Sequence, residues 1–171
     1  MLTIAPLDAS DIDEIAAAFL SLGWNKPASQ YVEYLEQQLA GERIVLVARL
    51  DGTFCGYVTL LKHSHHSEFI EHNIPEIADF NVLPNVRKRG IGSALMDAIE
   101  EQARFLASDV GIAVGMTADY GSAQRMYVKR GYIPTGMGLF ADGRPVSYGE
   151  QLTVDDGLLL TFTKQLVDAK A

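Results

Sequence analysis

The chain has few of the features that mark secreted, membrane or disulfide-bonded proteins. Its 171 residues include one cysteine, Cys55, so no internal disulfide can form. No apolar run approaches the roughly 18 residues of a membrane-spanning helix. Residues 1–8 lack the basic and apolar regions of a signal peptide, which predicts a cytoplasmic protein.

Positive charge is also scarce. Fourteen Lys and Arg stand against 22 Asp and Glu, and the net charge of -8 argues against nucleic acid as the main partner. The net negative charge agrees with a cationic amine as a ligand. The composition, 48% apolar and 21% charged, excludes disordered and low-complexity proteins. No linker or repeat divides the chain, so we predict one ordered domain over residues 1–171.

Hydrophobic periodicity predicts an α/β fold with the order β-α-α-β-β-β-α-β-α-β-β. The clearest signal is a hairpin of strands 44–50 and 53–61, joined by the favoured turn Asp51-Gly52. A strand over 74–83 precedes a turn and a long helix that starts near Ile91. Further strands are expected over 4–7, 110–114, 132–135 and 158–162, and further helices over 12–20, 27–39 and 122–130.

The most informative segment is the turn before that long helix. Arg87, Lys88 and Arg89 stand side by side there, followed by Gly90 and Gly92. A helix N-terminus presents free N–H groups, so cations and glycines at this point favour binding of a diphosphate. The alternative is an exposed basic corner whose glycines only serve the turn. The nucleotide-binding motifs Gly-x4-Gly-Lys-Ser/Thr and complete Gly-x-Gly-x-x-Gly do not occur.

Arg87-x-x-Gly90-x-Gly92 resembles the acetyl-CoA-binding motif Q/R-x-x-G-x-G/A of the GCN5-related N-acetyltransferase (GNAT) superfamily, with Val82 and Pro84 at the usual places upstream. The resemblance implies the GNAT fold, a central mixed, mostly antiparallel twisted sheet of about seven strands flanked by about four helices. It also implies acetyl-CoA as co-substrate. The chain is most similar to a bacterial branch of that superfamily.

A second match lies downstream. Ala123-x-x-x-Tyr127-x-x-x-Gly131-Tyr132 resembles the family's motif N-x-x-A-x-x-x-Y-x-x-x-G-F/Y, and Tyr120 stands where the family often has Asn. The resemblance implies that the pantetheine arm takes hydrogen bonds from the backbone near Asn81 and Val82. The residues expected to bind the coenzyme are Asn81, Val82, Leu83, Arg87, Lys88, Arg89, Gly90, Ile91, Gly92, Ser93, Tyr120, Ala123 and Tyr127.

Acetyl transfer needs an oxyanion donor, a general acid and a proton acceptor. A backbone N–H near Asn81 or Val82 is the candidate donor to the oxyanion. Tyr127 is the candidate acid, since a phenol with a pKa of about 10 can protonate a departing thiolate in a concerted step. The alternative is that Tyr127 only packs on the sheet and orients the coenzyme sulfur.

Two carboxylates compete for the role of general base. Glu76 lies eleven positions before Arg87, the offset of the base in the histone-acetylating branch of the family. Asp79 is the rival, because strand alternation puts it on the other face together with Asn81, and a bulge would scramble that alternation. A water, or a purely structural role for both carboxylates, is the further alternative.

On the acceptor side we expect Trp24, Tyr31 and His65 to contact the substrate, with packing in the core as the alternative for the aromatic residues. No metal is predicted, because the four histidines lack the spacing of a ligand set. The segment 138–156 could cover the acceptor or form a homodimer contact.

The leading hypothesis is therefore an N-acetyltransferase that moves acetyl to a primary amine of a small molecule or peptide, by direct attack in a ternary complex. A non-catalytic acetyl-CoA-binding sensor and a nucleotide-binding domain are the alternatives. O-acylation and acyl groups other than acetyl also stay open, and no membrane partner is expected.

Overall fold

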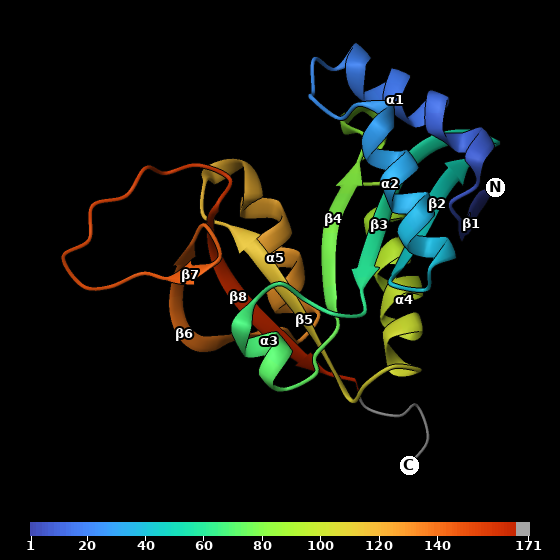
Figure 1. The fold of residues 1–171 in the computed structure, drawn as a ribbon. Coiled ribbons are helices and arrows are strands. Elements are labelled where there is room, and N and C mark those ends of the chain that lie inside the picture. Colours follow the sequence, from blue (N-terminus) through green and yellow to red (C-terminus); the bar gives the residue numbers. More distant parts are fainter. Residues whose placement is uncertain (167–171) are drawn as a thin grey trace. The chain divides into compact units, whose positions relative to one another are not determined.

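The computed structural model describes residues 1–166, which gather into two compact units (Figure 1). The first unit consists of Met1–Lys62 and Ala78–Gln102, and the second of His63–Ile77 and the described residues 103–166. Strand β4, Glu76–Val82, begins in the second unit and ends in the first.

The first unit is built from three complete strands, two helices that pack on them, and the long helix α4. Its elements are β1 (Leu2–Pro6), a 3-10 helix (Ala9–Asp11), α1 (Ile12–Ser21), α2 (Ala28–Leu39), β2 (Arg43–Leu50), β3 (Thr53–Leu61), the end of β4, a second 3-10 helix (Pro84–Val86) and α4 (Ile91–Arg104). The strands pair in the order β1-β2-β3-β4.

Local signals in the sequence set several of these boundaries. Asp8 caps the first helical segment, because its carboxylate accepts from the Ser10 N–H. The Asp8 N–H in turn donates to the Asp11 carboxylate, which completes a capping box. Asp51 and Gly52 both have positive φ, as a two-residue turn matched to strand twist requires, so the predicted hairpin is confirmed.

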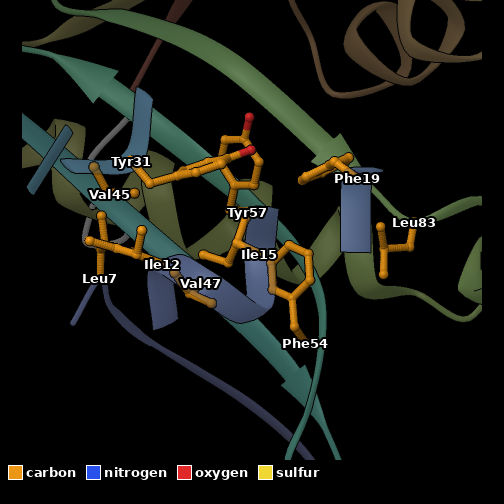
Figure 2. Close-up of a cluster of buried hydrophobic side chains, with 10 residues drawn as sticks. All are labelled: Leu7, Ile12, Ile15, Phe19, Tyr31, Val45, Val47, Phe54, Tyr57 and Leu83. Carbon is orange, nitrogen blue, oxygen red and sulfur yellow. The ribbon is translucent and has the colours of Figure 1, made fainter. Parts of the chain in front are cut away.

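The core of the first unit lies between the helix pair and the hairpin (Figure 2). Phe19 of α1 meets the rings of Phe54 and Tyr57 edge to face, with centroids 5.9 and 5.8 Å away. Tyr31 of α2 is fully buried against Tyr57. Cys55 is also buried, and its thiol donates to the Ala48 carbonyl. Burial raises the pKa of this thiol.

The second unit holds the remaining strands in the pairing order β4-β5-β8-β6-β7. Strands β4 and β5 run parallel through the pairs Glu76 with Gly111 and Ile77 with Ile112, whereas β5–β8, β6–β8 and β6–β7 are antiparallel. Its elements are α3 (Ser67–Glu71), β5 (Asp109–Gly115), a 3-10 helix (Ala118–Tyr120), α5 (Gly121–Lys129), β6 (Ile133–Ala141), β7 (Arg144–Pro145) and β8 (Leu158–Gln165).

The pairing confirms the predicted mixed, mostly antiparallel architecture, with eight strands in the described residues. One short element is additional. The polar segment after β3 contains helix α3, whose Phe69 is buried with its ring over Gly111, so close that a Cβ there would lie 2.5 Å from the ring. Residues 138–145 belong to the β6–β7 hairpin, which turns at Asp142 and Gly143. No helix of the described chain is long and apolar enough to cross a membrane.

Candidate functional site

Strand β4 is irregular in the middle. Asp79 has a φ of +44°, in the left-handed region that non-glycine residues rarely enter, so the regular alternation of side chains stops there. The ladder with β5 includes pairs at Glu76 and Ile77, and no further pair within the described residues. Within the described residues, the pairing with β5 thus covers the start of β4.

The end of β4 is fixed against β3. The Leu83 N–H donates to the Cys55 carbonyl at 3.0 Å. Gly56 of β3 lies so close to β4 that a Cβ would stand 2.6 Å from the Asn81 carbonyl oxygen. The absence of a side chain at Gly56 thus permits the close approach of the two strands at Asn81 and Val82.

The basic turn leads from β4 into α4. Arg87, Lys88, Arg89 and Gly90 are all exposed, and the Arg87 Nε donates to the Val82 carbonyl at 3.1 Å. Gly90 has a φ of +80° and open space around its missing Cβ. At the start of α4 the Ala94 N–H donates to the Gly90 carbonyl at 3.0 Å.

Such a terminus suits an anion, because the first N–H groups of a helix have no carbonyl one turn earlier to bond with. Gly92 is half-buried and Ser93 exposed at the start of α4. The residues therefore fit a diphosphate group, because three exposed cations directly precede the backbone donors in the chain. The positive φ of Gly90 also shows that glycine serves the turn itself, so the two interpretations of this corner are compatible.

The Asp79 carboxylate is surrounded by donors, all within the first unit. Its Oδ1 accepts from Lys26 Nζ at 2.7 Å, and the ion pair is largely shielded, with 19% side-chain exposure on both sides. The further donors are Asn81 Nδ2 at 2.8 Å, Gln30 Nε2 at 2.8 Å, the Tyr34 hydroxyl at 2.8 Å and the Tyr57 hydroxyl at 2.5 Å. Burial, followed by the charge of Asp79, raises the pKa of Tyr34 and of Tyr57.

Glu76 lies in a different polar cluster, in the second unit. It is buried, and its Oε2 accepts from the Ser64 hydroxyl at 2.6 Å. Its Oε1 lies 3.5 Å from Nε2 of His66, which is buried between the rings of Phe69 and Phe140. Thus the sequence-predicted bases Glu76 and Asp79 have separate sets of partners.

The histidines that follow β3 differ in burial. His65 is exposed, whereas His66 is the histidine beside Glu76. Glu68 of α3 is buried and accepts weakly from Thr135 at 3.4 Å. The sequence-based choice among the four histidines was His65, whereas His66, together with Ser64, is the one that contacts Glu76. All positions of the segment 63–66 are polar, so nothing in the sequence distinguishes the buried histidine from the exposed one. No group of three or more candidate metal ligands occurs in the described part of the chain.

The second motif lies on α5 and its flanks. Tyr127 is buried with its ring 5.8 Å from that of Tyr132, and burial raises the pKa of its phenol. The ring of Tyr120 covers Gly115, and its hydroxyl donates to Asp156 at 3.1 Å. Ala123 is half-buried on α5. Tyr120 thus has a packing role in addition to any contact with a coenzyme.

The aromatic residues of the helix pair are core residues to different degrees. Tyr31 has no exposed surface. Trp24 is half-buried and stacks on Phe19 at a centroid distance of 5.6 Å. Tyr31 is therefore a core residue. Part of the Trp24 side chain is exposed, so it could contact a ligand.

Comparison with known proteins agrees with this geometry. Residues 9–132 match the model of the acetyltransferase (GNAT) family, and the chain belongs to that family. A curated relative from Azospirillum brasilense, described as an uncharacterized N-acetyltransferase in the hisH-hisA intergenic region, is 33% identical over 97 residues. That match covers 54% of this chain and 56% of the relative, so the chain spans little more than half the relative's length.

Solved structures share the fold over nearly the whole chain. An N-acetyltransferase from Staphylococcus aureus Mu50 superposes with a TM-score of 0.71 at 14% identity, covering 98% of this chain and 99% of that one. The protein yncA from Salmonella typhimurium, a putative acetyltransferase solved with its cofactor acetyl-CoA, gives 0.68 at 19% identity, covering 99% of this chain and 96% of that one. These likenesses support the fold expected from the sequence.

Proposed function

We propose that the protein is an acetyl-CoA-dependent N-acetyltransferase whose acceptor is a primary amine of a small molecule or a peptide. The observation that carries the proposal is the exposed cationic turn Arg87–Gly90 at the N-terminus of α4, in the motif the family uses for its coenzyme. Residues 1–171 act as one domain in this proposal, since the family match extends across both compact units.

The coenzyme diphosphate is bound by Arg87, Lys88 and Arg89 and by the N–H groups at the start of α4. Charge-assisted hydrogen bonds to phosphate are about twice as strong as neutral ones, which suits a ligand of this charge. The pantetheine arm pairs with the edge of β4 near Asn81 and Val82, where the ladder with β5 has ended. The remaining proposed contacts are Leu83, Ile91, Gly92, Ser93, Tyr120, Ala123 and Tyr127.

The amine attacks the thioester carbon directly in a ternary complex. A C–N bond forms, the C–S bond breaks, and the amine proton leaves to a base. A backbone N–H near Asn81 or Val82 donates to the oxyanion, and needs no reorganisation because the strand holds it. The burial of Cys55 supports direct attack, since an acyl-enzyme on this thiol would need an accessible thiolate.

Tyr127 protonates the departing thiolate. Its raised pKa keeps the phenol protonated at neutral pH, and makes concerted rather than stepwise donation the feasible route. Glu76 is the proposed base, with a water carrying the proton. Asp79 is less suited, because five donors already occupy its two oxygens. Trp24 and His65, which both have exposed surface, are the proposed acceptor contacts.

Calorimetry with acetyl-CoA tests the coenzyme site. Wild-type protein should bind, and the double substitution Lys88→Gln with Arg89→Gln should weaken binding at least about tenfold, since one hydrogen bond to a charged group contributes about 1.5–3 kcal/mol. The matched control is Arg125→Gln with Lys129→Gln, which removes two exposed cations of α5. Its affinity should stay near that of the wild type.

Absence of acetyl-CoA binding by the wild type would overturn the proposal. Release of free coenzyme thiol across a panel of amines then separates an enzyme from the alternative sensor. Binding without turnover on any amine would favour the sensor.

A further inference from the structure

Lys26 and Asp79 form an ion pair between the loop joining α1 to α2 and the middle of β4. Lys26 Nζ also donates to the Tyr57 hydroxyl at 3.0 Å. The ammonium lies 5.8 Å from the ring centroid of Phe19 and 5.7 Å from that of Tyr57. A cation between a carboxylate and aromatic faces, largely shielded from water, is held more tightly than a surface ion pair.

Asp79 is also the residue at which β4 departs from regular geometry. Its φ of +44° is unfavourable for a residue with a Cβ and persists where surrounding contacts fix it. Those contacts come from four directions, because the Asp79 donors lie in the α1–α2 loop, in α2, in β3 and in β4 itself.

The residue before Asp79 is anchored as well. The Thr59 hydroxyl donates to the Ala78 carbonyl at 2.6 Å and accepts from Arg43 Nη1 at 2.7 Å. Arg43 is buried, with its guanidinium 4.2 Å from the ring centroid of Tyr34, which itself bonds Asp79. Two hydrogen-bonded chains therefore hold two consecutive residues of β4.

We propose that Asp79 is a positioning residue, with Lys26 as its fixed counter-ion. The pair holds the irregularity of β4 in one geometry, and so fixes the direction of the backbone N–H groups that follow it. The functional part rests on the proposed function, in which an N–H near Asn81 or Val82 meets the pantetheine arm or the oxyanion. Misplacement of reacting groups by about 1 Å can cost roughly 100-fold in rate, so such a device matters to turnover.

A positioning role and a general-base role for Asp79 predict different effects of substituting Lys26 and Asp79. If Asp79 were the base, Lys26→Met would leave the carboxylate in place, and Asp79→Asn would remove the acidic limb of the pH–rate profile. If Asp79 positions β4, both substitutions disturb the same element and the acidic limb remains. Their effects are then less than additive in the double variant, since each breaks the same ion pair.

The first measurement is amide hydrogen exchange in the ligand-free protein at Leu83, whose N–H donates to the Cys55 carbonyl where β4 ends and is therefore protected. This measurement does not depend on any activity. Lys26→Met and Asp79→Asn should each accelerate exchange at Leu83 at least about tenfold, and Lys26→Arg should restore much of the protection. The control is Arg49→Met, which breaks the ion pairs of Arg49 with Asp11 and Glu14 in the same unit. It should leave exchange at Leu83 unchanged.

The second measurement is the pH dependence of kcat and KM for the same variants. Lys26→Met and Asp79→Asn should lower kcat about 10- to 100-fold with the acidic limb intact, whereas Glu76→Gln should lose that limb. Loss of the limb in Asp79→Asn, or unchanged exchange in Lys26→Met, would overturn the positioning role. Equal acceleration of amide exchange in Arg49→Met would also overturn it, because the effect would then reflect general destabilisation of the first unit. A failure to bind acetyl-CoA would refute only the proposed function, because the exchange experiment still decides the structural claim.

Discussion

At the scale of single residues, the environments of the candidate catalytic groups differ more than their sequence positions suggest. Strand alternation alone places Asp79 opposite Glu76 but cannot say which faces a substrate, because the left-handed φ of Asp79 breaks the alternation. Nor could the sequence show the five donors on Asp79, which come from segments up to 53 positions away. The exposed basic turn before α4 was predictable, because its cations, glycines and helix start are contiguous, and its binding of phosphate stays a prediction.

Tyr127→Phe tests the acid at this scale. We expect kcat to fall roughly 100-fold while the Kd for acetyl-CoA stays within a few-fold, because the substitution removes one proton donor and keeps the ring. Steady-state kinetics with calorimetry measure both quantities. Because the pKa of Tyr127 is raised, the wild-type rate should not decline through loss of this proton below about pH 10. Unchanged turnover in the variant would remove Tyr127 from the mechanism.

At the scale of elements, prediction succeeded where the determining contacts are local. The β2–β3 hairpin follows from its alternation and from Asp51-Gly52. Helix α1 follows from the helical spacing of its apolar residues Ile12, Ile15 and Phe19, which are buried. Helix α3 did not follow, because a helix of five residues has too few turns to show a period. Its position depends on Phe69 packing over Gly111, which is 42 positions distant and invisible to local patterns.

Gly56→Ala tests the close approach of β3 and β4. The new Cβ would meet the backbone of Asn81 and Val82 at 2.6 and 3.2 Å, so the strands must separate. We expect the free energy of unfolding to fall by about 1–3 kcal/mol, and acetyl-CoA affinity to decrease with it. Urea denaturation and calorimetry are the measurements.

The matched control is Gly121→Ala. Gly121 has a helical φ of -57° and no heavy atom within 4 Å of an added Cβ, so alanine should be neutral or stabilising. Equal losses of stability in the two variants would contradict the steric argument.

At the scale of the whole molecule, buried phenols are expected to lower the stability of the fold at alkaline pH. Burial is the main cause that raises the pKa of Tyr31, Tyr34 and Tyr57 above the ordinary value of 10. Below that value the phenols are neutral in both states, and the full stability is present. Above pH 10 the phenols ionise in the unfolded chain but stay neutral in the folded protein. Each such tyrosine therefore lowers the unfolding free energy by up to about 1.4 kcal/mol per pH unit.

We therefore expect the unfolding free energy to decline steeply between about pH 10 and 11. Urea titrations across this interval, with phenolate absorbance recorded in parallel, measure the decline. Tyr34→Phe should make it shallower, whereas Tyr148→Phe, at a fully exposed side chain, should not. A flat profile up to pH 11 would contradict the prediction.

The burial of the single cysteine also determines how the chemistry can be followed. Cys55 is 1% exposed and bonded to the Ala48 carbonyl, so the folded protein presents no ready sulfhydryl to a dye added to the solution. Each turnover of the proposed reaction liberates one small, mobile sulfhydryl. A colorimetric disulfide reagent can thus count product continuously without background from the polypeptide, and any slow baseline colour reports transient opening of the first unit.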